Sequence, residues 1–259
     1  METIEADEWV TGKIQLQVEN NLFEMELTVQ ANPVKPQRML PVFQQITNLY
    51  VEFGVAATKS EGKNISCKKG CGACCRHFVA VSEVEAYDIA ELVEKMPEPR
   101  RSEVKERFNK ALTHFTETGW IERFENCAEY SDKNTLEVLS DYFKEGVPCP
   151  FLVDESCSIH NDRPLTCREY LVTSPAENCQ NPTRENIDLV KLPVRPMGNI
   201  LELGQKKPVN GLNVVPLIAS LKWAETNADN FPEKTGEEWM TDFFQSVTKG
   251  EIPQESATD

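Results

Sequence analysis

Eight of the nine cysteines in this 259-residue chain fall into two runs. The members of the two runs are Cys67, Cys71, Cys74 and Cys75, followed by Cys149, Cys157, Cys167 and Cys179. The closest spacings, two to three residues between thiols, let neighbouring sulfurs converge on one ion. Cysteines that are buried singly have no reason to gather in this way. The arrangement therefore indicates a metal site, to which the two runs contribute eight thiolates.

The same cysteines would form disulfides in an oxidising compartment, so the compartment matters. The chain begins with an acidic, polar stretch, Met1 to Glu8, which lacks the basic and apolar regions of a secretory signal. Its longest apolar stretch, near Val214 to Leu221, is far short of the roughly 20 residues that a membrane-spanning helix needs. Adjacent Cys74 and Cys75 would also be strained within a disulfide framework. We therefore expect a cytoplasmic protein whose thiols are free.

The net charge limits the partners that the chain can have. A formal charge of −15 and a pI near 4.8 argue against nucleic-acid binding, which needs a basic surface. The same acidity argues against binding to anionic membranes. The expected partner is a metal ion or cluster, with no nucleic acid and no membrane, and a protein partner or substrate stays open.

The residues beside the cysteines bear on the kind of metal. Gly72 and Ala73 are small, which leaves backbone N–H groups free to point at the sulfurs and to tune a cluster. Cys149 precedes a proline, as in the cysteine–proline pair that closes ferredoxin cluster motifs. Cys74 and Cys75 diverge because they are adjacent, so they rarely ligate one ion together. Two nearby ions, or one ion and a supporting thiol, both accommodate them. These features favour an iron–sulfur cluster over zinc.

The elements that must position the cysteines are predicted to be mostly helical. Lys13 to Val18 and Phe23 to Gln30 alternate apolar and polar residues, which predicts a β-hairpin. Val42 to Ala57 carries apolar residues at the helical period. Gly62 to Gly72 is polar and rich in glycine, so the first cysteine run should begin in a loop.

Helices are also expected between and after the two runs. Ser82 and Glu85 form a capping box that begins a helix ending near Met96. Arg101 to Thr118 has an apolar face and is followed by Gly119, a residue typical of helix C-termini. Further predictions are helices at Trp120–Tyr130 and Thr135–Lys144, a short helix carrying Cys167 with Asp162 as its N-cap, a strand at Ile187–Leu192, and helices near Val215–Ala228 and Thr235–Val247.

These patterns predict a mainly α fold with a small N-terminal β-hairpin and an irregular cysteine-rich metal-binding core. We expect three parts in chain order. Residues 1–60 would form the hairpin and a helix, residues 61–180 the cysteine-cluster domain with a helical insertion, and residues 181–259 a C-terminal helical extension. Because neither run explains the adjacent cysteines by itself, we expect the two runs to meet in space.

The motifs in the two runs resemble those of the CxxCxxCC cysteine-cluster family over roughly Ser66 to Cys179. They read Cys71-Gly72-Ala73-Cys74-Cys75, Cys149-Pro150-Phe151-Leu152, Cys157-Ser158-Ile159-His160 and Cys167-Arg168-Glu169-Tyr170. That family is described as a zinc- or iron-chelating domain, and some members are similar to flagellin lysine N-methylases with an iron–sulfur cluster. The resemblance implies a bound iron–sulfur cluster or zinc, and as ligands Cys67, Cys71, Cys74, Cys75, Cys149, Cys157, Cys167 and Cys179.

Two classes of function follow from these observations. One is a metal-binding protein whose centre has a structural, storage or electron-transfer role. The other is a metal-dependent protein-modifying enzyme such as a lysine N-methylase-like protein, although no catalytic group can be named. A rival interpretation is a radical S-adenosylmethionine enzyme, because Cys67, Cys71 and Cys74 have that spacing. Such enzymes need repeated strand–helix units, which this chain lacks after Cys75.

Residues outside the eight cysteines are predicted to have supporting roles. His77 and His160 lie beside the runs and are candidates for ligands or proton carriers. Supporting or structural roles are favoured, since eight thiols already satisfy two four-coordinate sites. His114 should be an ordinary helix side chain, and Cys127 a small core residue. Arg163, Arg168 and Tyr170 are candidates for offsetting thiolate charge through hydrogen bonds, and the alternative for Arg163 is that it caps a helix.

Overall fold

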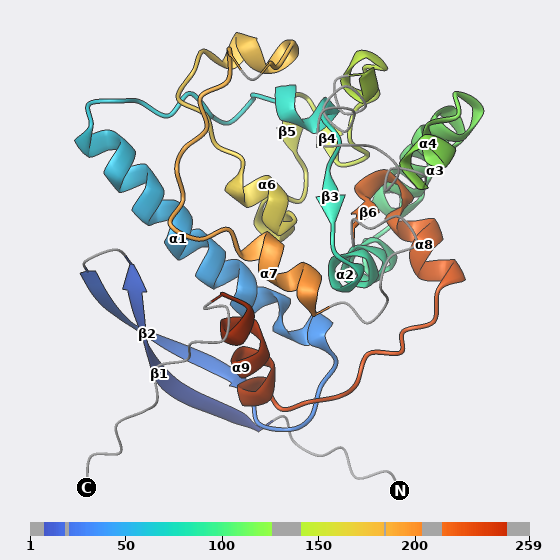
Figure 1. Ribbon diagram of the computed structural model, residues 1–259. Helices are drawn as coiled ribbons and strands as arrows, with labels where there is room; N and C mark the ends of the chain where they lie inside the picture. The colour runs from blue at the N-terminus through green and yellow to red at the C-terminus, as the bar shows by residue number, and fades with distance from the viewer. Residues whose placement is uncertain (1–7, 19–20, 126–140, 184, 204–213, 248–259) are drawn as a thin grey trace, which may run out of the picture.

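The structure is a computed structural model that describes residues 8–18, 21–125, 141–183, 185–203 and 214–247. Most of its regular structure is helical, and its described strands pair only in two-stranded antiparallel sheets. The predicted fold class is therefore confirmed (Figure 1). Among the described residues, none of the helices combines the length and apolar character needed to cross a membrane.

The N-terminal hairpin consists of β1 (Trp9–Val18) and β2 (Asn21–Gln30), paired in register from Trp9 opposite Gln30 to Val18 opposite Asn21. The predicted hairpin is confirmed with longer strands, and its turn residues lie outside the described ranges. After a proline-containing break the chain enters α1 (Leu40–Ser60), which runs across the molecule (Figure 1).

The first hydrophobic core joins the hairpin to both α1 and the C-terminal helix α9 (Gly236–Val247). Residues at helical spacing on α1 are fully buried, and the Phe43 and Phe243 rings stack with centroids 4.8 Å apart. The buried members of this core are Leu27, Val29, Met39, Leu40, Val42, Phe43, Ile46, Tyr50, Val84, Leu165, Met197, Ile200, Phe231, Trp239, Met240 and Phe243. Burial of these apolar side chains is the main force that holds the N- and C-terminal segments together.

A second hydrophobic core is built mainly from the middle part of the sequence. It is formed by α2 (Glu83–Glu94) and α3 (Arg100–Glu117), which is followed by α4 (Trp120–Glu125). The capping box before α2 is present, and Gly119 takes a left-handed φ of 76° after α3, as predicted. The predicted helices at Trp120–Tyr130 and Thr135–Lys144 lie only partly within the described residues.

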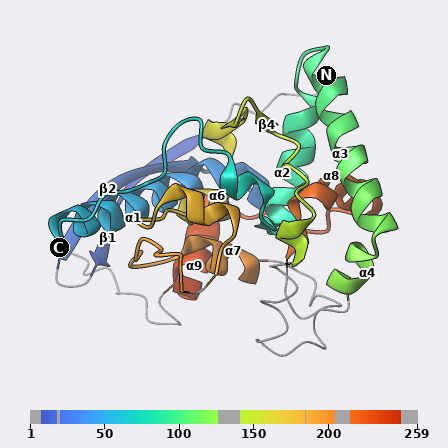
Figure 2. The same cartoon turned by 90° about the horizontal axis from the view of Figure 1, so that it is seen from above.

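The C-terminal third returns to both cores through short elements. They are α6 (Leu165–Glu169), α7 (Pro196–Glu202), β6 (Val215–Pro216), α8 (Ser220–Thr226) and α9. Strand β6 pairs with β3 (Ala80–Val81), and α8 packs against α2 (Figure 2).

Two sequence-based predictions are corrected in this region. Among the described residues, the strand predicted at Ile187–Leu192 is reduced to a bridge between Val172 and Leu189, because it pairs there with the short segment after α6. The helix predicted from Val215 begins at Ser220, because Val215 and Pro216 pair with β3 and are followed by a 3₁₀ turn. Pairing across the sheet overrides the local helical pattern at this point.

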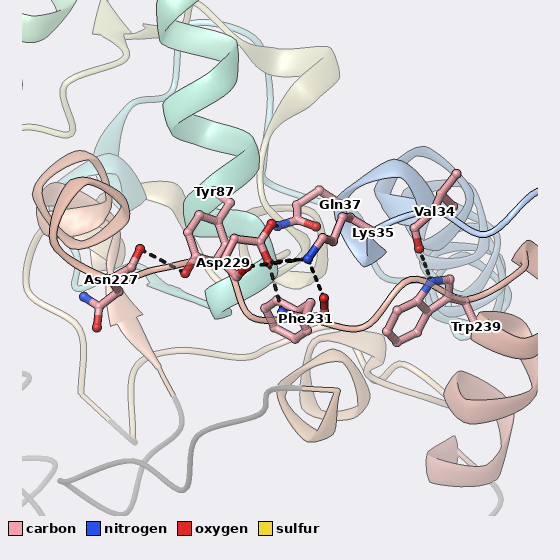
Figure 3. Close-up of polar contacts among 8 residues, drawn as sticks. All are labelled: Val34, Lys35, Gln37, Tyr87, Asn227, Asp229, Phe231 and Trp239. Atoms are coloured by element: carbon pink, nitrogen blue, oxygen red, sulfur yellow. Dashed lines mark hydrogen bonds and ion pairs between the residues drawn. The ribbon is translucent and has the colours of Figure 1, made fainter. Parts of the chain in front are cut away.

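The segment between α8 and α9 is tied to the loop before α1 (Figure 3). The Asp229 carboxylate accepts hydrogen bonds from Gln37 Nε2 and from the Phe231 backbone N–H, each at 3.1 Å. The Trp239 indole N–H donates to the Val34 carbonyl at 2.8 Å. The Gln37–Asp229 and Val34–Trp239 contacts join residues 192 and 205 positions apart, and they tie α9 and the segment before it to the loop that follows the hairpin.

Candidate metal centre

The first cysteine run follows α1 as a loop and then a 3₁₀ turn, Ala73–Arg76, that contains Cys74 and Cys75. Gly70 has φ +84°, a conformation that favours glycine, and the Cys71 N–H closes the preceding turn on the Lys68 carbonyl. The predicted loop is confirmed.

The second run begins with the small hairpin of β4 (Leu152–Val153) and β5 (Ser156–Cys157). Its two turn residues, Asp154 and Glu155, both have positive φ, as a two-residue turn of this hand requires. Cys149 and Cys157 pack against the second core beside Phe151, so this part of the run rests on a rigid base.

Cys167 lies on α6, the predicted short helix, but the helix is capped in an unexpected way. Pro164 occupies the N-cap position and offers no side-chain cap, so the prediction of Asp162 as N-cap is wrong. The Glu85 carboxylate instead accepts the Leu165 N–H at 2.8 Å, while its other oxygen accepts from Ser82. A buried carboxylate from α2 therefore caps the helix that carries Cys167.

Cys179 is buried in the 3₁₀ helix Ala176–Gln180, which packs against the turn that holds Cys74 and Cys75. The Cys179 carbonyl lies 2.9 Å from His77 Nε2. Cys67 is held nearby, because the Val172 N–H donates to its sulfur at 3.4 Å.

An ion pair and a backbone bond join the two runs directly. Arg76 forms a two-pronged contact with the Glu155 carboxylate, at 3.0 and 2.7 Å. The Cys149 N–H donates to the Cys75 carbonyl at 2.7 Å. A Cβ on Gly72 would come within 2.5 Å of Glu155 Oε2 and 2.8 Å of Leu152 Cδ1, so glycine lets the two loops approach closely.

The structure brings all eight clustered cysteines to the wall of one cavity of about 660 Å³. Each of them is a free thiol. The two runs meet, as the adjacent cysteines led us to expect. Cys127 lies outside the described residues.

Burial and mutual proximity determine the protonation of these thiols. Burial, followed by the neighbouring thiols, raises the pKa of Cys179 to about 11, and burial raises that of Cys149 to about 12. Burial also places the pKa of Cys167 well above its ordinary value. The hydrogen bond from Cys75 lowers the pKa of Cys74 to about 7 and raises that of Cys75. Without a metal, most of these thiols are therefore neutral at pH 7.

Arg163 is a positive charge that lies beside several of the thiols. It lines the cavity, its charge helps to lower the pKa of Cys74, and it acts in the same direction on Cys67 and Cys157. Its buried Nε has no hydrogen-bond partner among the described residues. The charge of this guanidinium favours the thiolate forms of these cysteines. Arg168, by contrast, donates hydrogen bonds to the carbonyls of Arg163 and Asn161 and to the Asn48 side chain.

The three histidines differ in their contacts and in their position relative to the cavity. His77 is held by the Cys179 carbonyl and by edge contacts with Phe143 and Tyr170, and burial lowers its pKa. His160 lines the cavity, and its pKa is lowered chiefly by Arg163. His114 lies 2.8 Å from Glu145 and is not among the residues that line the cavity.

The donor set fits zinc or iron, but the side chains are not drawn together around an ion. In the described part of the chain, no group of three or more histidine, cysteine, aspartate or glutamate side chains is arranged to hold a metal. Neutral thiols pack as small apolar groups and have no electrostatic reason to converge. Metal binding displaces their protons, and rotation of the side chains into the cavity would then bring the sulfurs together.

Two positioning features were not recognised from the sequence. Glu85 was identified as a capping-box residue, but its second role on α6 left no local signal. The Arg76–Glu155 pair joins residues 79 positions apart, and nothing in either neighbourhood marks the partner.

The fold and the cavity define a mainly helical protein with a cysteine-lined cavity. Residues 66–187 match the CxxCxxCC family, described as "Putative zinc- or iron-chelating domain". The match covers just under half of the chain and confirms the resemblance drawn from the motifs. The comparison with curated proteins gave no significant match, and neither did the comparison with solved structures.

Proposed function

We propose that this chain is a metal-binding protein whose centre is held by its eight clustered cysteines and has a structural, storage or electron-transfer role. The observation that carries the proposal is the gathering of all eight free thiols, from two distant runs, on the wall of one cavity. The ligands are Cys67, Cys71, Cys74, Cys75, Cys149, Cys157, Cys167 and Cys179.

Burial supports metal binding over a passive role for these thiols. Eight neutral thiols are poor hydrogen-bond donors and contribute no more than small apolar side chains would. Arg163 lines the cavity, its buried Nε has no hydrogen-bond partner among the described residues, and its charge favours the thiolate forms of Cys74, Cys67 and Cys157, so negative charge in the cavity would be matched by this guanidinium.

We favour an iron–sulfur cluster over zinc for the bound group. Backbone N–H groups of Val172, Phe151 and Ile159 bond to the sulfurs of Cys67, Cys149 and Cys157. Such bonds stabilise thiolates and raise the reduction potential of a cluster. When bound, the cluster would supply one-electron chemistry, and the protein would supply the ligands, the N–H groups and the charge of Arg163.

Metal analysis of anaerobically purified protein tests both levels of this proposal. We expect iron and sulfide in the protein, with broad absorption at roughly 400 nm that bleaches on reduction. Stoichiometric zinc in a colourless protein would reject the cluster and retain metal binding. Protein that holds neither metal after reconstitution would reject the function.

A second candidate function is a metal-dependent protein-modifying enzyme similar to the lysine N-methylases. The observation in its favour is the size of the cavity, because about 660 Å³ lies within the range of small-molecule sites, roughly 300 to 1,000 Å³. Apolar side chains such as Val79, Ile159 and Leu217 complete the wall. Titration calorimetry of the metal-loaded protein with S-adenosylmethionine is the test, and a lack of binding would remove this candidate.

A further inference from the structure

We propose that Arg168 is a positioning residue of the metal centre, an inference that rests on the metal-binding function proposed above. Its guanidinium holds closed the loop between two of the proposed ligands, Cys157 and Cys167. Arg168 acts through the backbone that carries these two cysteines, without being a ligand itself.

Helix α6, which carries Cys167, cannot fix its own position. It has five residues, and isolated helices shorter than about 12 residues are marginal in water. Contacts with other elements must therefore place it. Thr166 Oγ1 donates to the Ala80 carbonyl on β3 at 2.8 Å, and the Glu169 carboxylate accepts the Met197 N–H of α7 at 2.7 Å. These bonds and the cap from α2 hold the helix on three sides.

Arg168 supplies the contact between α6 and the chain that precedes it. Only 5% of its surface is exposed. Its Nε donates to the Arg163 carbonyl at 2.9 Å, and one terminal nitrogen donates to the Asn161 carbonyl. The other terminal nitrogen donates to Asn48 Oδ1 at 3.1 Å. Each nitrogen of the guanidinium thus has a partner, and two of these partners are backbone carbonyls.

The two carbonyls belong to the loop that joins Cys157 to Cys167. This loop contains the 3₁₀ turn His160–Asp162, and both His160 and Arg163 line the cavity. Because the carbonyls are bonded to a side chain of α6, the loop is folded back onto the helix that follows it. One guanidinium therefore limits how far the backbone at the two cysteines can move apart.

The third bond anchors this unit to the first hydrophobic core. Asn48 lies on α1 next to Thr47, which is fully buried, and α1 packs against α6. The guanidinium is planar and presents its N–H donors in fixed directions, so it can serve acceptors on a loop and on a helix at the same time. A lysine ammonium in its place would not match this arrangement.

A loop that is held in place before the metal arrives lowers the cost of binding. Sulfurs must come within about 2.3 Å of the ion, so mobile ligand segments have to be ordered on binding. Groups that orient metal ligands without touching the metal typically contribute about 10- to 100-fold in affinity. Without Arg168, residues 158–166 would lose their attachment to α6, and this ordering would oppose metal binding.

The test compares metal affinity with stability, using the full chain under anaerobic conditions. Co²⁺ is the probe, because tetrahedral thiolate coordination gives it visible absorption bands. Arg168→Met should weaken the Co²⁺ affinity, measured by competition with a chelator, by about 10- to 100-fold. Arg168→Lys should recover only part of this loss.

The control is Trp239→Phe, which removes another buried bond to a carbonyl, at a residue that does not line the cavity. It should lower the free energy of unfolding of the metal-free protein and leave the Co²⁺ affinity unchanged. An unchanged affinity in Arg168→Met, or an equal loss of affinity in Trp239→Phe, would overturn the positioning role and leave metal binding intact.

Asn48 offers a milder pair of variants outside the loop. Asn48→Asp keeps an acceptor for Arg168 and should retain the parent affinity, whereas Asn48→Ala should weaken it by a smaller factor than Arg168→Met. If Arg168→Met does not fold, an unchanged affinity in Asn48→Ala overturns the proposal. A parent that binds no Co²⁺ would instead overturn the metal-binding function itself.

Discussion

Glu85 shows how one buried side chain positions a ligand that lies far away in the sequence. Its side chain is almost completely buried, and its two oxygens serve different elements, the start of α2 and the start of α6. Burial raises the pKa of this carboxyl, and the N–H donors of Ser82 and Leu165 oppose that shift. The carboxylate thereby fixes the N-terminal end of the helix that carries Cys167.

Replacing this carboxylate by an amide should be costly. In Glu85→Gln the amide nitrogen would face a backbone N–H that the carboxylate now accepts, leaving a buried donor without a partner. We expect the free energy of unfolding to fall by about 1 to 3 kcal/mol. Urea unfolding at pH 7 measures the change. The control is Glu91→Gln, which removes an exposed pair with Lys95 and should cost at most about 0.5 kcal/mol; equal losses in the two variants would contradict the capping role.

Asp88 gives the stability of the protein a pH dependence of known sign. Burial, followed by repulsion from Glu91 and Glu85, raises its pKa to about 6, from 3.8 in the unfolded chain. Between these values the folded state binds more protons, so the free energy of unfolding falls as the pH rises. Removing the charge should therefore stabilise the protein at pH 7.

We expect Asp88→Asn to be more stable than the parent by about 1 to 3 kcal/mol at pH 7, with a difference that shrinks as the pH is lowered to 5. Thermal or urea unfolding at several pH values measures it. Glu52→Gln, an exposed change on α1, is the control and should show no such trend. A difference that grows on acidification would refute the sign.

At the scale of elements, close approaches decide how the short helices and strands fit together. Helix α9 begins at Gly236, where a Cβ would lie 2.5 Å from Val29 Cβ and 2.7 Å from the Gln30 carbonyl. The start of the helix is thus pressed against β2 at its last two residues. Gly198, within α7, has no atom within 4 Å of the same hypothetical Cβ.

This contrast predicts opposite effects from one chemical change. Gly236→Ala should destabilise the protein by about 1 to 3 kcal/mol, because α9 must move away from the hairpin. Gly198→Ala should be neutral or stabilise by up to about 1 kcal/mol, because alanine is the better helix former. Denaturant unfolding of both variants beside the parent provides the measurement, and a stabilising Gly236→Ala would show that the contact with β2 is loose.

At the scale of the whole molecule, the cysteine loops lie over two cores without a large apolar core of their own. Phe151 and Ile159 insert into the second core, and Leu165 inserts into the first. The stretches around Cys67 to Cys75 contribute no buried apolar side chain to either core. The proposed metal centre would therefore be the main stabilising element of that part of the chain.

Removing the metal should loosen the cysteine region selectively. A thiolate–metal site can contribute on the order of 10 kcal/mol of apparent folding free energy. Chelation, or Cys74→Ser or Cys167→Ser, should therefore open residues 66–187 to limited proteolysis while α1 and α9 stay protected. Cys127→Ser should change the pattern much less. Equal resistance in the parent, the chelated protein and the three variants would show that the helices hold the region without metal.

The sequence by itself determined the class of the fold, the hairpin, α1 to α3, α9 and the clustering of eight cysteines. Those features depend on near neighbours: alternation, helical period, a capping box and close thiol spacing act within a few residues. The strand predicted at Ile187–Leu192 and the helix start at Val215 were wrong for the same reason, since partners elsewhere in the chain decided both.

Only the tertiary structure decided which contacts position the segments that carry the cysteines. The cap that Glu85 provides to α6, the Arg76–Glu155 pair and the pairing of β3 with β6 all join residues far apart in the chain. Such contacts form only when burial of apolar side chains in the cores offsets the entropy lost in closing the long loops between the partners. No local sequence pattern reports that balance. Which cysteine neighbours which is therefore a property of the folded chain.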